Sequence, residues 1–387
     1  MGAVLGAILG DLASSLSVPG VYRQETFARP APVLLTGVPG FVGFAQTSRS
    51  SPVLLRRFQD RDAGLFMPDG GSLLPATLRG FFDNGGDRCY VACADVTGAA
   101  GDAEGALAAA LDSLAAVDEL DLLALPDAMG LPAAAVLRLQ ARALAQCAQL
   151  ANRVALLDAL RAATPAEVLA QGRALTAGLG DVVNGALYHP WVRTDDGSLV
   201  PPCGLVAGVI ARTDAAAGVF KAPANALLSG VVDLASDIDD LAQQPLNDAG
   251  INCLRALPGR GIRIWGARTL SRDPAWRYLS VRRLVLTLHR WIEQNLGWAA
   301  FEPNTPVLWA QVERVLRRHL TGLWQAGALI GDRVEQAFYV RCNADTSPAQ
   351  ARANGQLVTE IGLCPAAPAE FVVVRVNLRS AVAAQAA

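Results

Sequence analysis

The chain has 387 residues, of which 52% are hydrophobic and 18% charged, and its formal net charge is −2. This composition excludes a disordered protein and leaves room for two or three domains that each bury a core. No stretch of 18 or more apolar residues occurs, so no membrane-spanning helix is predicted. The apolar first 20 residues lack a basic start and contain Asp11, which disfavours a signal peptide.

The seven cysteines are odd in number and scattered, a usage that fits a reducing compartment. Cys89 and Cys93 lie four apart in an apolar, strand-like run, where both point to one face. No second pair of ligands completes a metal site around them. We therefore expect buried structural thiols at these positions.

The chain begins with a predicted arm, residues 1–25. Its segment 18–25, VPGVYRQE, is a short extended stretch after a Pro-Gly turn, with no obvious strand partner nearby. By its residues alone it is equally well a frayed terminus or an ordinary first strand. The central residues of this segment are Val18, Pro19, Gly20, Val21 and Tyr22.

Strand-like and helix-like segments alternate from residue 26 to residue 195. Strands are predicted at 33–45 (strand, turn, strand), 89–96, 120–126, 153–160 and 186–192. Helices are predicted at 73–82, 103–116, 132–150 and after the capping signature Thr164-Pro165-Ala166-Glu167. Such alternation indicates an α/β domain with a largely parallel sheet. Between residues 83 and 130 there are ten acids and one arginine, so this domain is acidic.

Residues 196–368 form a second predicted domain of α+β type. In its central stretch, 250–283, Ile262, Ile264 and Trp265 are typical of a short buried strand. Asp273-Pro274 is predicted to open an amphipathic helix, with Arg283 and Arg290 on the face opposite its apolar residues. Pro306 is predicted to begin another helix with an apolar stripe.

The second domain is basic. Between residues 251 and 324 there are 12 arginines and four acids, an imbalance that favours an acidic partner. A nucleic acid fits poorly, because the isoelectric point is about 6.0 and no helix-turn-helix or RRM signature occurs. Ordinary solvated helix faces remain the alternative. The candidate contact residues are Arg282, Arg283, Arg290, Arg314, Arg317 and Arg318.

The chain ends in a second predicted arm, residues 369–387. Apolar and polar residues alternate along it, the period-two pattern of a strand with one apolar face. This strand could close the sheet of its own domain or pair across a subunit boundary. Its apolar residues are Phe371, Val372, Val373, Val374, Val376 and Leu378.

The sequence contains no clear motif for an enzyme active site. The glycines after the strand at 89–96 are spaced G-x-x-G-x-x-x-G, and Asp102 and Glu104 among them would repel a phosphate. The three histidines lie in no recognisable nucleophile elbow or metal spacing. Asp214 and the segment Glu302-Pro303-Asn304 could equally be polar anchors of the fold.

Several short motifs recur together in a known family. KAPAN at 221–225, LN and GIN at 246–252, GIRIWGAR at 261–268 and FEPN at 301–304 resemble, in this order, the C-terminal domain of contractile tail sheath proteins. That family includes the sheaths of phage tails, R-type pyocins and extracellular contractile injection systems. The resemblance is dense from residue 188 to residue 371 and thin before it. The motif positions are Lys221, Pro223, Asn225, Asn247, Asn252, Trp265, Gly266, Arg268, Glu302, Pro303 and Asn304.

The resemblance implies a two-domain subunit of α/β and α+β class, with an outer α/β domain at 26–195 and an inner, tube-facing domain at 196–368. The arms at 1–25 and 369–387 would each be donated as a strand to neighbouring subunits. The implied function is structural: subunits polymerise as a helical sheath around an inner tube and contract to drive the tube through a target envelope.

The same resemblance implies no enzyme activity and no cofactor. The implied partners are further copies of the chain, the inner tube protein, and baseplate and terminator or cap proteins, with no nucleic acid and no direct membrane insertion. Assembly would take place in the bacterial cytoplasm, in a phage-tail-like particle of a kind that can be released.

Two features depart from the family pattern. Cys203 stands in VPPCG where a serine is expected, and the chain is short for a phage sheath. The short length favours a pyocin-like or extracellular injection particle. A nucleotide-binding α/β enzyme and a non-contractile helical structural protein remain the alternatives.

Overall fold

The fold is known from a computed structural model that describes residues 34–45, 51–58, 71–95 and 102–370. Both predicted arm strands, at 18–22 and 371–378, lie outside the described residues. The described helices include none that is both long enough and apolar enough to cross a membrane.

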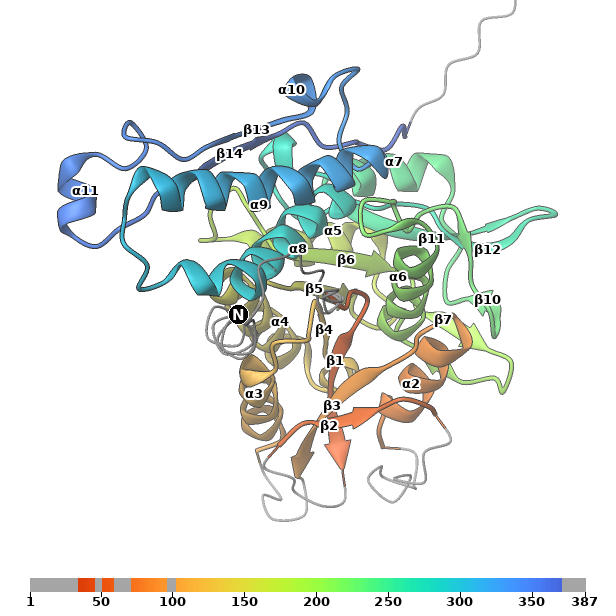
Figure 1. Ribbon diagram of the computed structural model, residues 1–387. Coiled ribbons are helices and arrows are strands. Elements are labelled where there is room, and N and C mark those ends of the chain that lie inside the picture. The colour runs from red at the N-terminus through yellow and green to blue at the C-terminus, as the bar shows by residue number, and fades with distance from the viewer. Residues whose placement is uncertain (1–33, 46–50, 59–70, 96–101, 371–387) are drawn as a thin grey trace, which may run out of the picture. The chain divides into compact units, whose positions relative to one another are not determined.

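A nine-stranded sheet forms the centre of the molecule, in the order β2-β3-β1-β4-β5-β6-β11-β12-β9 (Figure 1). The six strands from β3 to β11 are parallel, and β2, β12 and β9 pair antiparallel at its edges. The predicted α/β class with a largely parallel sheet is therefore confirmed. The strands are β1 (Pro39–Ala45), β2 (Val53–Leu55), β3 (Cys89–Asp95), β4 (Leu122–Ala124), β5 (Val154–Asp158), β6 (Gly185–His189), β9 (Ala226–Leu227), β11 (Ile251–Leu257) and β12 (Gly261–Ile264).

Helices cover both faces of this sheet, which explains why its strands are apolar runs. The cluster on one face includes residues of α2 (Leu74–Asp83) and α6 (Cys203–Ala217). The cluster on the other face includes residues of α3 (Ala103–Ser113), α4 (Ala133–Leu150), α5 (Pro165–Thr176) and α7 (Asp240–Asp248). The predicted capping signature begins α5, where the Thr164 hydroxyl accepts from the Glu167 N–H and the Glu167 carboxylate accepts from the Thr164 N–H.

The sheet does not stop at the predicted domain boundary between residues 195 and 196. β6 precedes the boundary and β11 follows it, yet the two strands pair in parallel, with Ile251 opposite Leu187 and Cys253 opposite His189. A small three-stranded sheet, β10-β7-β8, lies beside them and is built from β7 (Val192–Thr194), β8 (Leu199–Val200) and β10 (Val231–Leu234). The division into two domains at this point stays a prediction.

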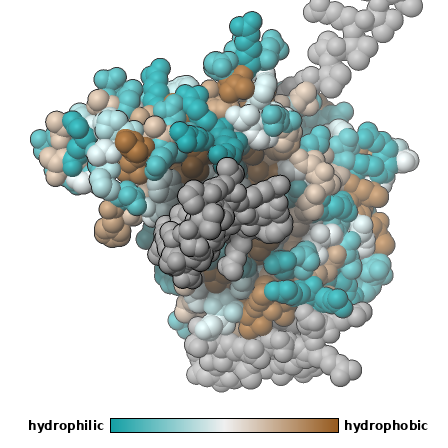
Figure 2. Space-filling view, viewed as in Figure 1, coloured by the Kyte–Doolittle hydropathy of each residue, from teal (hydrophilic) through white to brown (hydrophobic). Residues whose placement is uncertain are grey.

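A third cluster of buried residues forms a C-terminal layer from α8 (Leu279–Leu296), α9 (Pro306–Gln325) and β13 (Phe338–Arg341), which pairs with β14 (Glu360–Leu363). Short helices α10 (Val334–Ala337) and α11 (Ala349–Ala353) flank these strands (Figure 1). Hydrophilic residues predominate on the face of the molecule seen in Figure 2, with scattered hydrophobic ones between them. Single turns of 3-10 helix lie at Leu114–Ala116, Pro126–Gly130, Pro274–Trp276 and Gly297–Ala299.

The start of α8 differs from the prediction. Asp273 does cap a turn, because its carboxylate accepts from the Ala275 N–H at 2.8 Å, but that turn is a separate 3-10 helix. The α-helix begins at Leu279. The predicted start of the next helix at Pro306 is confirmed.

Candidate assembly surfaces

Arg283 is buried within its own chain, which corrects the expectation that it faces a partner. Its side chain is 2% exposed and donates to both oxygens of Asp214, at 2.8 and 2.6 Å, and to Asp121 Oδ2 at 2.7 Å. Burial alone would lower the pKa of Arg283, but the two carboxylates raise it well above its ordinary value. Asp214 is therefore a polar anchor of the fold, which was one of the two roles that the sequence left open for it; the other was a catalytic group.

Arg282 and Arg290 are also buried within the chain, because α8 packs between two clusters of buried residues. Residues of α8 belong both to the C-terminal layer and to the cluster against the sheet, so its three arginines meet protein rather than solvent. Arg282 donates to Asn184 Oδ1 at 2.6 Å, and Arg290 donates to the Glu119 carbonyl at 3.0 Å. A basic outer surface therefore cannot include these two arginines or Arg283 in this conformation.

The arginines of α9 remain exposed. Arg314 and Arg318 make no hydrogen bond or ion pair with any described residue. Arg317 is half-exposed, pairs with Glu313 at 2.8 Å and donates to the Val340 carbonyl of β13 at 3.1 Å. Of the six candidate residues, these three alone present charge on the described surface.

The two-stranded sheet β13-β14 has outer edges that pair with no other described strand. The Cys364 N–H donates to the Ala337 carbonyl, which fixes the alternation of the antiparallel pair. By that alternation the main-chain groups of Ile361 and Leu363 point away from β13, and those of Val340 point away from β14. Arg317 therefore covers the outer edge of β13, while the outer edge of β14 carries no such cover among the described side chains.

Arg268 joins three motif residues into one network. The Asn252 side chain accepts from the Arg268 N–H at 2.7 Å and donates to the Arg268 carbonyl at 2.8 Å. The Arg268 guanidinium donates to the Asn247 carbonyl at 2.7 Å. Gly266 fits against this network because a Cβ there would lie 2.9 Å from Asn252 Oδ1.

The remaining donors of Arg268 hold Glu370, the last residue that the structure describes. Arg268 Nε lies 2.9 and 3.1 Å from the two carboxylate oxygens, and a terminal guanidinium nitrogen contacts one of them as well. The two side chains are only 7% and 18% exposed, and the pairing raises the pKa of Arg268. The network thus fixes the end of the described chain, at the second residue of the predicted arm 369–387. No local pattern in the sequence revealed this partner of Arg268.

Other motif positions hold turns. Asn225 adopts a left-handed conformation with φ of 57°, and its side chain accepts from Arg260 at 2.8 Å. Asn304 accepts from the Trp309 indole at 2.6 Å and donates to the Gln356 carbonyl. Pro223 is buried, and the Trp265 N–H donates to the Cys253 carbonyl. Lys221, Glu302 and Pro303 are exposed.

Cys203 is the first residue of α6 and fully buried, and its N–H donates to Asp158 Oδ1 at 2.9 Å. Burial raises the pKa of the Cys203 thiol and raises that of Asp158 to about 7. The predicted buried thiols Cys89 and Cys93 are confirmed as buried. No group of three or more His, Cys, Asp or Glu among the described residues could hold a metal ion.

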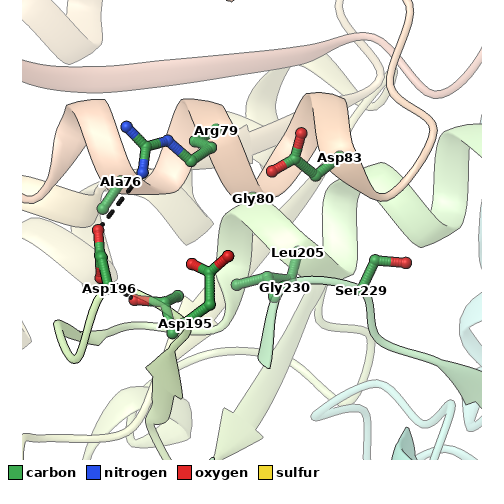
Figure 3. Close-up of a pocket in the computed structure, with 10 residues that line it drawn as sticks. Ala76, Arg79, Gly80, Asp83, Asp195, Asp196, Leu205, Ser229 and Gly230 are labelled. Carbon is green, nitrogen blue, oxygen red and sulfur yellow. Dashed lines mark hydrogen bonds and ion pairs between the residues drawn. The ribbon is translucent and has the colours of Figure 1, made fainter. Parts of the chain in front are cut away.

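The turn that suggested a nucleotide site holds a capping aspartate. Asp102 caps α3 by accepting from the Gly105 N–H at 2.8 Å, so its carboxylate lies where a phosphate would bind. A cavity beside α2, drawn in Figure 3, holds only about 20 Å³, and Arg79 points across it to Asp196 at 3.4 Å. That volume is room for about one water molecule. Burial also lowers the pKa of His189 and of His319 to about 4.

Comparison with known proteins identifies the family to which the chain belongs. Residues 102–270 match the family model of the phage tail sheath protein central domain, and residues 271–379 match that of the phage tail sheath C-terminal domain. A putative prophage major tail sheath protein of Pseudomonas aeruginosa is 28% identical over 177 residues, which are 44% of each chain. The aligned chain therefore spans less than half the length of that curated relative.

Two solved structures match almost the whole chain. A chain of the anti-feeding prophage helical sheath in its contracted state is 32% identical, with a TM-score of 0.74 over 94% of this chain and 100% of that one. A chain of the anti-feeding prophage baseplate is 31% identical, with a TM-score of 0.76 over 94% and 100%. Together with the two family models, these matches show that the chain belongs to the family of contractile tail sheath proteins.

Proposed function

We propose that this chain is the sheath subunit of a contractile injection particle. It polymerises as a helical sheath around an inner tube, contracts by rearrangement of its subunits and catalyses no reaction. The observation that carries the proposal is the match over 94% of the chain, and 100% of the other, to a contracted anti-feeding prophage sheath. Coverage of that whole chain also favours the extracellular injection type over a longer phage sheath.

The proposed link between subunits is strand donation. The segments 18–22 and 371–378 would add to the small sheet β13-β14 of neighbouring subunits. The open outer edge of β14 supports this, because an unpaired strand edge is a ready template for another strand. Such contacts join unlike surfaces, so they propagate as a helical lattice instead of closing a dimer. Arms would let subunits rotate past one another without separating.

The proposed tube-facing surface is the exposed face of α9. Arg314, Arg317 and Arg318 give it a positive charge that an acidic tube surface would match. Exposed ion pairs contribute only about 0.2–1 kcal/mol each, so many must act together and each can be exchanged during contraction. The energy of contraction would be stored at assembly, in a metastable lattice held by the tube, the baseplate and a terminator. Assembly would take place in the bacterial cytoplasm.

The decisive experiment is negative-stain electron microscopy of the purified full-length chain and of a chain that lacks residues 371–387. This truncation keeps Glu370, so the body retains the Arg268 network. Tubes from the full-length chain that vanish on truncation are the expected result. A full-length chain that stays dispersed, with and without a co-expressed tube protein, would contradict the proposal. Tubes that never shorten would favour a non-contractile helical protein.

A further inference from the structure

A cavity of about 350 Å³ opens beside the Arg268 network. The second half of α5, the end of α7 and the loop 268–277 enclose it. Three exposed arginines from two of these elements line it: Arg173, Arg272 and Arg277. None of the three guanidinium groups makes a hydrogen bond or ion pair with a described residue, so the cavity is a site of unneutralised positive charge.

The wall of this cavity already binds a carboxylate. Arg268 also lines it, and its guanidinium is neutralised by Glu370. Asp248 is the single acid among the lining residues, so three free arginines stand against one carboxylate. Arginine side chains bind carboxylates in a planar, two-pronged geometry. The cavity therefore fits a ligand that carries at least two carboxylates.

The chain itself contains a matching acidic segment, residues 232–241. Between residues 222 and 254 there are five aspartates and no lysine or arginine. Four of them lie in the segment and are exposed: Asp233, Asp237, Asp239 and Asp240. Asp240 pairs with Arg255 and Asp239 caps α7, whereas Asp233 and Asp237 have no cationic partner among the described residues. Val232 and Leu241, at its two ends, are 60% and 82% exposed.

Within one subunit the cavity and the segment lie at opposite ends of α7. The segment runs into the first residues of α7, and Asp248 at the other end of α7 lines the cavity. A helix of this length separates its ends by about 13 Å. The two surfaces are also unlike, so a contact between them joins one copy to the next and leaves a free surface at each end. That is the type of contact that builds an open helical polymer.

We propose that segment 232–241 of one subunit docks into the basic cavity of a second copy of this chain. The carboxylates of Asp233 and Asp237 bind Arg272 and Arg277, with Arg173 beside them, and Leu241 covers the apolar part of the rim near Leu169. This contact joins the rigid bodies of two subunits and is separate from the donated arms.

The test is photo-cross-linking in assembled tubes of the full-length chain, with p-benzoylphenylalanine in place of Leu241. Isotope-labelled and unlabelled subunits are mixed, so that mass spectrometry identifies cross-links between copies. The expected product joins position 241 to residues 169–173 or 270–277 of another copy. Arg272→Glu with Arg277→Glu should abolish it, and the further changes Asp233→Arg and Asp237→Arg should restore it. Arg161→Glu with Arg193→Glu, outside the cavity, alters the net charge equally and should leave the product unchanged.

A salt titration of the chain with all its native charges provides a second measurement that does not depend on the folding of any charge variant. The cross-link yield should fall as salt rises to 1 M, where charges are screened over about 3 Å. Cross-links that map elsewhere, or that survive both the charge reversal and high salt, would overturn the docking proposal. Since tube formation is scored independently in the microscope, such a result would leave the sheath function standing.

Discussion

Arg268 holds the carboxylate of Glu370 across 102 residues of sequence, with Nε at 2.9 and 3.1 Å from its two oxygens. Arg268 belongs to the body of the subunit, whereas Glu370 is the second residue of the predicted C-terminal arm, 369–387. A tether is useful to a moving lattice only if its point of attachment is fixed. For the proposed C-terminal tether, the Arg268 network would supply that fixed point.

Glu370→Gln should loosen the attachment without unfolding the subunit. The substitution removes the charge from hydrogen bonds that each contribute about 1.5–3 kcal/mol, while Arg268 keeps its bonds to Asn247 and Asn252. We expect faster proteolysis just after residue 370 and fewer or shorter tubes, with a melting temperature within a few degrees of the native value. Glu335→Gln, at an exposed position of α10, is the matched control. Equal cleavage rates in the two variants would contradict the anchoring role.

Arg283→Met should destabilise the subunit strongly. It leaves Asp121 and Asp214 buried without their cation, and breaking a buried ion pair in this way costs about 3–5 kcal/mol. Arg314→Met makes the same replacement at an exposed, unpaired position and should change stability by less than about 0.5 kcal/mol. Guanidinium unfolding midpoints measure both. Similar midpoints would mean that Arg283 does not form this buried cluster in solution.

Charge reversal on α9 should distinguish two proposed roles of its arginines: contact with the inner tube, and cover of the outer edge of β13. Arg318→Glu removes an exposed charge with no described partner, so it should weaken co-assembly with an inner tube and leave tube-free assembly intact. Arg317→Glu also frees the Val340 carbonyl at the outer edge of β13, so it should additionally raise strand-mediated aggregation. Co-sedimentation with the tube and light scattering distinguish the two effects. Unchanged co-sedimentation of both variants would rule out the α9 face as the tube contact.

Stability should fall as the pH rises from about 4 to about 7, in part because of Asp158. Burial raises its folded pKa to about 7, against an ordinary value of 3.8, so the folded state holds a proton that the unfolded state has lost. The stabilising contribution is complete below about pH 4 and is lost as the pH passes about 7, a change of up to about 4 kcal/mol.

Asp158→Asn keeps an acceptor for the Cys203 N–H but cannot titrate. Its melting temperature should therefore decline less between pH 5 and pH 8 than that of the native chain. The control is Asp87→Asn, since Asp87 is exposed and its only partner within the described part of the chain is Arg88, in a surface pair. Parallel pH profiles of the native chain and the Asp158 variant would show that the carboxyl is charged in the folded state.

Local patterns in the sequence were enough to predict most of the alternating strands and helices, the Thr164 capping box, the helix from Pro306 and the buried cysteines. Each depends on neighbours within a few residues, where periodicity and capping chemistry act. Of the strand-turn-strand predicted at 33–45, the described residues contain only the second strand, β1. The order of the short motifs was enough to predict the family. The strands proposed for the arms stay predictions, since they lie outside the described residues.

Tertiary structure alone decided what the charged residues do. The periodicity of α8 placed Arg283 on a polar face, but whether that face meets water or carboxylates depends on Asp121 and Asp214, 162 and 69 residues away. In the same way, Arg268 and Arg317 looked alike as arginines in a basic stretch, yet one binds Glu370 and the other covers a strand edge. A sequence records which side chains carry charge, whereas the packing of distant elements determines which of those charges are neutralised inside the subunit and which remain for a partner.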